Sequence, residues 1–171
     1  IIDFFAQYTY QPWVVYSAIF GCMFICSLGI PIPEEIILVS SGVVGDMSLH
    51  PDLYPPPFPG SPSVHPATLA IVCLFSVVST DFFVYYIGKF FGNKILTSTT
   101  FSKHLPMEKM LRIRDWAKKY GFYAPGIFRF TPGFRFPGHL MCGALGVSAW
   151  AFLITDGLVA LISVPTQVLA V

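Results

Sequence analysis

The stretch FRFTPGFRFP, residues 128–137, places two arginines and a Thr-Pro-Gly turn inside an otherwise apolar segment. A second interruption, GIPIPEE, occupies residues 29–35. Proline lacks an amide hydrogen and glycine tolerates unusual backbone angles, so both residues break helices. The pattern predicts two helical hairpins, at 13–45 and 121–147. Their breaks are formed by Pro31, Pro33, Pro132, Gly133 and Pro137.

The composition places these hairpins in a membrane. Of the 171 residues, 54% are hydrophobic and only 11% are charged, whereas a soluble domain carries about 25% charged residues. A chain of this length cannot hide so much apolar surface in one aqueous core. Four stretches contain no Asp, Glu, Lys or Arg: 4–33, 53–80, 136–155 and 157–171. Since about 20 apolar residues cross the hydrocarbon, we predict an all-α integral membrane protein. A cytoplasmic enzyme, a disordered chain and a nucleic-acid binder are excluded.

The basic residues predict the orientation in the membrane. All ten lie between Lys89 and Arg135, whereas the proline-rich segment 46–65 has none. Because lysine and arginine are retained on the cytoplasmic side, we expect 89–120 in the cytoplasm. The loop 46–65 then lies on the outer side of the membrane. Apolar residues recur at helical spacing within 100–120, which predicts an amphipathic helix on the inner leaflet.

The two breaks form a weak internal repeat. Each reads Gly-apolar-x-apolar-Pro, at 29–33 and 133–137, with a glycine nine residues after the last proline. Interrupted apolar segments at corresponding positions of two halves are typical of transporter sites. We therefore predict an inverted repeat, in which each re-entrant hairpin precedes a transmembrane helix, at 66–90 and 148–171. A full span over 13–32 is the alternative for the first half.

Ionisable residues within the apolar segments are the candidate site. A charge at bilayer depth costs at least ~2.5–3.5 kcal/mol, so its presence indicates a function. Arginines beside the second break offer planar, permanently charged donors to phosphate, and acids or histidine exchange protons. Internal pairing that only joins helices is the alternative, above all for the two aspartates. The predicted site comprises Arg129 and Arg135 for phosphate, Glu35, Glu34 and His139 for protons, and Asp81 and Asp156 as supporting buried charges.

No catalytic constellation accompanies these residues. The serines have no His/Asp partner at a known spacing, and HExxH, CxxC and Walker-loop motifs are absent from the sequence. We predict a protein that is not an enzyme and that uses no cofactor and no metal ion.

Four stretches resemble the DedA family, whose members are also called SNARE-associated Golgi or VTT-domain proteins. They are PIPEE at 31–35, DFFVYYIGK at 81–89, FRFTPGFR at 128–135 and GALGV at 143–147. The resemblance implies a transporter that moves lipids between leaflets, with undecaprenyl phosphate or phosphatidylethanolamine as the bacterial substrates. It also implies that the family's essential acid corresponds to Glu35 and its essential arginines to Arg129 and Arg135. The chain departs from the family at Glu34, where Gly or Ser is usual, and at Asp156, where many relatives have Asn.

We therefore expect a transporter of a phosphate-bearing lipid, either undecaprenyl phosphate or a phospholipid such as phosphatidylethanolamine. Its partners would be membrane lipids, together with protons or another coupling ion. The sequence leaves open whether the chain forms a homo-oligomer. A proton-coupled carrier of a small anion or osmolyte and a non-transporting assembly factor are the alternatives. Because the chain starts at Ile1 and stops in an apolar run at Val171, we expect it to be part of a longer protein.

Overall fold

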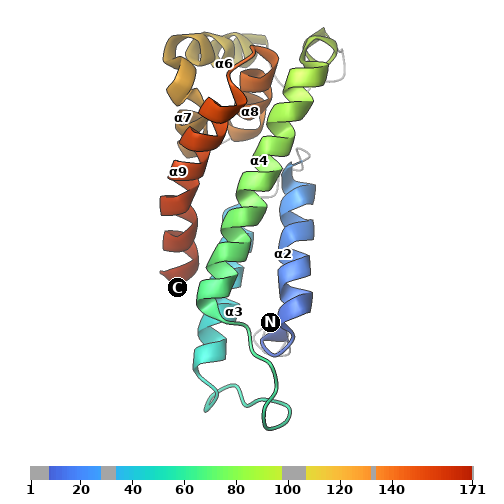
Figure 1. Ribbon diagram of the computed structural model, residues 1–171, viewed down its shortest axis with the longest axis vertical. Helices are drawn as coiled ribbons and strands as arrows, with labels where there is room; N and C mark the ends of the chain where they lie inside the picture. The colour runs from blue at the N-terminus through green and yellow to red at the C-terminus, as the bar shows by residue number, and fades with distance from the viewer. Residues whose placement is uncertain (1–7, 28–33, 98–106, 132–133, 171) are drawn as a thin grey trace. The chain divides into compact units, whose positions relative to one another are not determined.

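The structure, a computed structural model, describes residues 8–27, 34–97, 107–131 and 134–170. These residues form helices and contain no strand, which confirms the all-α class (Figure 1). The predicted break residues Pro31, Pro33, Pro132 and Gly133 lie outside the described residues. The elements are α2 (Pro12–Ser27), α3 (Glu34–Leu49), α4 (Pro66–Thr97), α6 (Met107–Tyr120), the 3-10 turn η1 (Gly121–Tyr123), α7 (Ala124–Phe130), α8 (Arg135–Ala144) and α9 (Ala149–Leu169).

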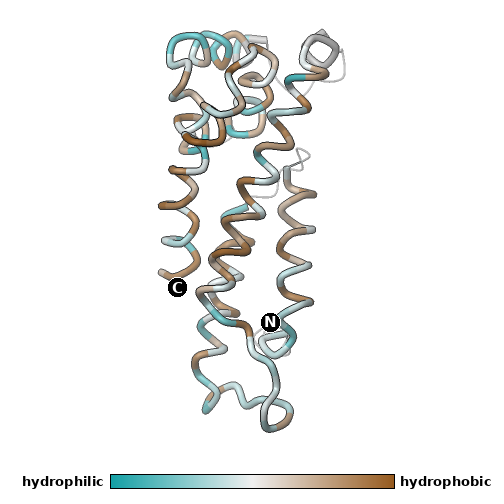
Figure 2. The backbone as a smooth tube through the Cα atoms, viewed as in Figure 1, coloured by the Kyte–Doolittle hydropathy of each residue, from teal (hydrophilic) through white to brown (hydrophobic). Residues whose placement is uncertain are grey.

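Two of the described helices are long and apolar enough to cross a membrane. They are Pro66–Gly92 within α4, with 27 residues, and Ala149–Leu169, with 21 residues. At a rise of 1.5 Å per residue these segments extend about 40 Å and about 32 Å, which covers the ~30 Å of hydrocarbon. Figure 2 shows hydrophobic residues along both helices. They coincide with the transmembrane helices expected at 66–90 and 148–171.

The chain divides into two compact units. Unit 1 consists of residues 1–77 and 161–171, and unit 2 consists of residues 78–160. Unit 1 therefore holds the first interrupted segment, and unit 2 holds the second one. Helices α4 and α9 each contribute residues to both units.

In unit 1 the first interrupted segment forms the helices α2 and α3, which pack against each other. Each has 16 residues and extends about 24 Å, less than the hydrocarbon thickness. The buried residues Val15, Ile19 and Met23 of α2 recur every four positions, so one face of the helix is buried. Re-entry into the membrane stays a prediction.

In unit 2 the second interrupted segment forms much shorter helices than expected. The spacing of the breaks predicts arms of about 14 residues, but α7 has 7 and α8 has 10. Gly121 ends the preceding helix with a positive φ of 49°, a conformation that glycine adopts without a steric penalty. Pro125 then stands in the first turn of α7, where its missing amide hydrogen is not needed. The turn around Gly121 occupies part of the segment that the sequence predicts as the first arm of the hairpin.

Helix α6 is amphipathic, as predicted, but its apolar side contacts protein. Ile113 and Ala117 are buried in the core of unit 2. The ring of Trp116 stacks on Phe128 and Phe134, with centroids 6.4 Å and 6.1 Å away. The apolar side of α6 therefore packs against the α7–α8 segment instead of being left for the lipid of the inner leaflet.

A close contact between α4 and α8 determines where the ionisable residues lie. A Cβ atom at Gly88 would collide with the carbonyl oxygen of Leu140, and one at Gly143 would collide with the carbonyl oxygen of Tyr85. Small residues permit this approach of two helix backbones, as in other membrane helices. Asp81 lies two turns before Gly88, and the residue before Leu140 is His139. The contact therefore brings the side chains of Asp81 and His139 close together.

Candidate functional site: a buried ion cluster

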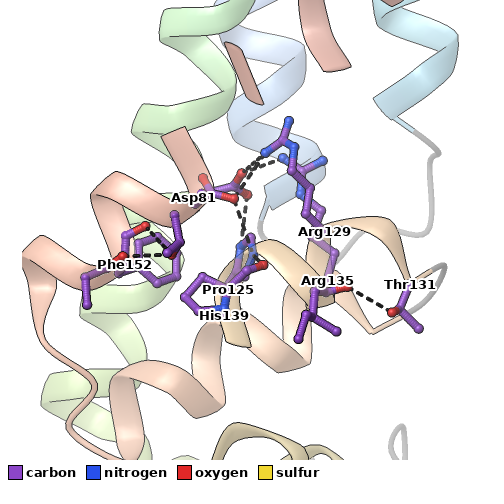
Figure 3. Close-up of polar contacts among 11 residues, drawn as sticks. Asp81, Pro125, Arg129, Thr131, Arg135, His139 and Phe152 are labelled. Atoms are coloured by element: carbon purple, nitrogen blue, oxygen red, sulfur yellow. Dashed lines mark hydrogen bonds and ion pairs between the residues drawn. The ribbon is translucent and has the colours of Figure 1, made fainter. Parts of the chain in front are cut away.

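Four helices of unit 2 bring five ionisable side chains together, and we call these five residues the ion cluster. They are Asp81 of α4, Arg129 of α7, Arg135 and His139 of α8, and Asp156 of α9. In Figure 3 the guanidinium groups of Arg129 and Arg135 lie together on one side of the Asp81 carboxylate, and the ring of His139 lies on another side. Every member belongs to unit 2, so the cluster is formed within one compact body.

Arg129 bridges the two aspartates. Its Nη1 lies 2.9 Å from Oδ2 of Asp81 and 3.3 Å from Oδ1 of Asp156. The side chains of these three residues are 5%, 7% and 1% exposed. Arg129 stands in the last turn of α7, and the carbonyl end of a helix favours a positive charge. The guanidinium thus joins α7 to both α4 and α9.

Arg135 makes the second contact to the same carboxylate and is the most exposed member of the cluster. Its Nη2 lies 2.6 Å from Oδ2 of Asp81, and 18% of its side chain is exposed. Both guanidiniums therefore converge on one oxygen atom of Asp81. Because the other members are more deeply buried, a ligand that enters the cluster would meet Arg135 first.

His139 lies at the closed end of the cluster, between the two aspartates. Its Nδ1 is 3.3 Å from Oδ1 of Asp81, and its Nε2 is 3.7 Å from Oδ1 of Asp156. Nε2 is also 3.4 Å from the carbonyl oxygen of Pro125. The edge of the ring packs on Phe152, with centroids 5.0 Å apart. Within the described part of the chain, Nδ1 of His139 and Oδ2 of Asp156 are buried and form no hydrogen bond.

The formal charges of the ion cluster cancel when the histidine is neutral. Two guanidiniums face two carboxylates, so the arginines predicted to bind phosphate are held by internal anions. The pairing that the sequence left open for Asp81 and Asp156 is therefore present. Carboxylate and phosphate oxygens accept the same hydrogen bonds from guanidinium, so an incoming anion would compete with Asp81.

A metal ion does not fit this arrangement. Asp81, His139 and Asp156 offer ligand atoms within 4.8 Å of one another, and these are suitable donor types. The guanidinium of Arg129, however, already lies between the two carboxylates. A divalent cation placed there would be repelled by this fixed charge.

The acids of the first break lie in unit 1. Glu34 and Glu35 occupy the first turn of α3, and Glu35 is exposed. Negative side chains are favoured at this end of a helix by its dipole. Their proton-exchanging role stays a prediction. Pro137 is the third residue of α8, within the first turn, where no amide donor is required.

Sequence reasoning missed two groups that contact His139. One is the carbonyl oxygen of Pro125, which carries no signal in the sequence because it belongs to the backbone. The other is Phe152, which lies four residues before Asp156. Residues four apart share a helix face, and this spacing could have placed Phe152 beside the cluster.

A buried ion cluster between apolar helices is typical of integral membrane proteins that handle charged groups. The family described as the VTT domain matches residues 32–171. The chain therefore belongs to the VTT-domain, or DedA, family of membrane proteins, as its motifs predict.

Three bacterial relatives illustrate this membership. An uncharacterized membrane protein of Haemophilus influenzae is 31% identical over 166 residues, which cover 96% of this chain and 70% of the relative. Uncharacterized membrane proteins of Mycobacterium bovis and Mycobacterium tuberculosis are 29% identical over 144 residues, or 83% of this chain. The match spans 61% of these mycobacterial proteins, less than two thirds of their length. No solved structure matches the chain.

Proposed function

We propose that this protein moves a phosphate-bearing lipid between the two leaflets of a membrane. The substrate would be undecaprenyl phosphate or a phospholipid such as phosphatidylethanolamine. One observation carries the proposal: Arg129 and Arg135 converge on a single buried carboxylate oxygen of Asp81. Two convergent guanidiniums are a strong oxyanion site, and here they lie among helices of a membrane protein. A headgroup phosphate would take the place of Asp81 at these donors.

Apolar surface supports a lipid over a small hydrophilic solute. In unit 1 an apolar groove runs between α2 and α4, lined among others by Trp13, Phe20, Ile71 and Phe75. These four side chains are also exposed on the surface. Hydrocarbon tails require such an apolar surface alongside the protein, whereas an osmolyte or small anion does not. In this proposal the tails stay in lipid while the headgroup crosses.

The proposal includes an orientation and a set of partners. The exposed basic residues of α6, among them Arg112 and Lys118, would lie in the cytoplasm. The loop at 46–65 would face the outside of a bacterial inner membrane. Protons or another ion would drive transport, and Glu35 and Glu34 would be among the residues that bind and release the proton. The chain would be able to form a homo-oligomer. The protein would transport its substrate without converting it, and without a cofactor.

Labelling tests this orientation. Cysteines introduced by Ser61→Cys in the loop and Lys118→Cys on α6, in a background without the native cysteines, would be exposed to a membrane-impermeant maleimide. On intact spheroplasts we expect labelling at position 61 only. Labelling at position 118 instead would reverse the proposed topology.

The decisive experiment is lipid translocation in reconstituted vesicles. Fluorescent polyisoprenyl phosphate and phosphatidylethanolamine would be compared in vesicles with and without the full chain. We expect at least one lipid to move faster with protein, and Arg135→Gln to lower that rate at least tenfold. Arg112→Gln, which removes an exposed arginine of α6, is the matched control and should change the rate less than twofold. If neither lipid moves faster than in protein-free vesicles, the proposal is wrong.

A non-transporting assembly role has one observation in its favour, which is that the charges of the ion cluster neutralise one another. Under this role, Arg135→Gln would lower stability and leave lipid movement equal to that of the wild type. A small-anion carrier would instead take up inorganic phosphate into the same vesicles. The same reconstituted vesicles therefore distinguish lipid transport, an assembly role and small-anion transport.

A further inference from the structure

We propose that anion binding at Arg129 and Arg135 is coupled to the uptake of one proton by His139, which lies between Asp81 and Asp156. The inference rests on the proposed function and assigns the coupling proton to the ion cluster of unit 2. It also changes the role of the two aspartates. They hold the arginines before the anion binds and hold the protonated histidine afterwards.

The first argument is the hydrogen-bonding capacity of the imidazole ring. The carbonyl oxygen of Pro125 and the carboxylate oxygens can only accept, and they face both ring nitrogens at 3.3–3.7 Å. A neutral imidazole has one donor and one acceptor nitrogen. In either tautomer, one ring nitrogen therefore faces an oxygen acceptor without a hydrogen to donate to it. Only the protonated ring turns both contacts into favourable ones.

The second argument is the balance of charge. With neutral histidine, the two arginines and two aspartates sum to zero. A singly charged phosphate diester would leave this buried cluster with a net negative charge, which is costly away from water. A proton on His139 restores the sum to zero. The anion and the proton therefore enter as a neutral pair, and no electron transfer or covalent change is involved.

The third argument is what the anion does to the existing pairs. An anion that draws Arg135 away leaves Asp81 with less positive charge nearby, because Nη2 of Arg135 is its shortest contact at 2.6 Å. The opposite oxygen of Asp81 faces the histidine ring. The imidazolium then replaces part of the lost attraction, since opposite charges at this distance stabilise each other.

The surroundings of the ring contain few other charged or titratable groups. In the described part of unit 2, α4 directs Asp81 at it and α9 directs Asp156 at it. Arg129 of α7 is paired with both of these carboxylates. The ring's own helix α8 supplies Arg135, and the nearby titratable residues are Tyr85 and Cys142. The phenol of Tyr85 donates to the carbonyl oxygen of Val147 at 2.6 Å. Helix α6 faces α8 with uncharged residues, Ile113, Trp116 and Ala117.

Linkage then dictates a pH dependence. If binding takes up one proton, the protonated form binds the anion more tightly, and affinity rises as pH falls. Over the range in which the site takes up a full proton, the apparent dissociation constant should rise about tenfold per pH unit. The same relation requires that bound anion increases proton occupancy at the cluster.

Calorimetry of the full chain in detergent micelles tests the coupling. The probe is dihexanoyl phosphatidylglycerol, whose single phosphate charge does not titrate near neutral pH, so that any proton taken up belongs to the protein. Titrations at the same pH in two buffers with different protonation heats give the number of protons absorbed per lipid bound. We expect a number near one for the wild type.

Three variants locate the proton. His139→Gln keeps a polar side chain of similar size but cannot accept the proton, so proton uptake should fall by at least fivefold while binding persists. His139→Asn provides a second, smaller amide if the first variant fails to fold. His65→Gln, at an exposed histidine of unit 1, is the control and should absorb the same number of protons as the wild type.

The possible failures are distinct. If the wild type binds no phosphatidylglycerol and none of the vesicle assays shows transport, the proposed function and this inference both fall. If the lipid binds with no difference between buffers, the inference alone is wrong. The inference is also wrong if His139→Gln still absorbs one proton, or if Glu35→Gln abolishes proton uptake while His139→Gln does not.

Discussion

The two interrupted segments share a sequence pattern but differ in the structures they form. In unit 1, α2 and α3 have 16 residues each, and the acid Glu35 stands exposed in the first turn of α3. In unit 2, α7 and α8 have 7 and 10 residues, and the arginines beside the break are held by buried aspartates. A Pro-Gly break therefore specifies where a helix stops. The helices packed around it decide whether the neighbouring charges are buried.

Removal of Asp81 should give the largest difference between the units. In Asp81→Ala both guanidiniums lose the carboxylate oxygen on which they converge, and uncompensated buried charge costs about 3–5 kcal/mol of stability. The free energy of unfolding in detergent micelles would measure the loss. Asp46→Ala, at an exposed acid of α3, is the counterpart in unit 1 and should change stability by less than about 0.5 kcal/mol. Equal losses would show that the cluster is not a buried network.

Glycine substitutions should give the next largest difference. Gly143→Ala places a methyl group against the backbone of Tyr85 and Lys89, and such overpacking costs about 3 kcal/mol. Gly21→Ala, on α2 of unit 1, meets no atom within 4 Å. It should be neutral or stabilise by up to about 1 kcal/mol because alanine favours the helix. The same unfolding measurement applies, and a tolerated Gly143→Ala would contradict the close approach of α4 and α8.

Tryptophan substitutions sharpen the comparison further. Trp116→Ala removes two ring stacks in unit 2, and we expect a loss of about 2 kcal/mol from aromatic pairs of this kind. Trp13 of unit 1 is 81% exposed, so Trp13→Ala should leave the thermal stability in detergent nearly unchanged. A large effect of Trp13→Ala would mean that α2 has a packing partner in the assembled protein.

Glu35→Gln should have the smallest effect on stability. The exposed acid interacts with the amino end of α3, and such an interaction contributes about 0.3–1 kcal/mol, less at high salt. Glu108→Gln, in the first turn of α6 in unit 2, is the matched change and should behave alike. Unfolding at low and high salt measures both. If Glu35→Gln alone lowers the free energy of unfolding by more than about 2 kcal/mol, Glu35 has a buried partner. The charges at the two breaks would then not differ in burial.

Much of the architecture follows from local sequence. Uncharged runs predict α4 and α9, and helical spacing predicts α6. The four-residue interval between Arg135 and His139 places both on one face of α8, so their proximity could be predicted as well. The short length of α7 could have been anticipated from Gly121 and Pro125, which restrict the chain ahead of the break.

The identity of the charge partners could not be predicted. Arg129 contacts aspartates 48 and 27 residues away in the sequence, and only the packing of α4, α7 and α9 selects them. His139 lies two residues after Pro137, as Glu35 lies two residues after Pro33. This equivalence predicts a shared role, but the structure gives His139 the neighbours Asp81 and Asp156. The apolar side of α6 was equally ambiguous, because lipid and a protein surface demand the same residues.

The glycine contacts between α4 and α8 also constrain how unit 2 can move. Where two backbones touch directly, no side chain can change rotamer to let one helix slide past the other. Gly88 and Gly143 therefore make Asp81 and His139 parts of one rigid body. Any opening of the ion cluster must therefore come from α7 or α9. Gly146, which has a φ of 73° between α8 and α9, is the natural pivot for such a rotation.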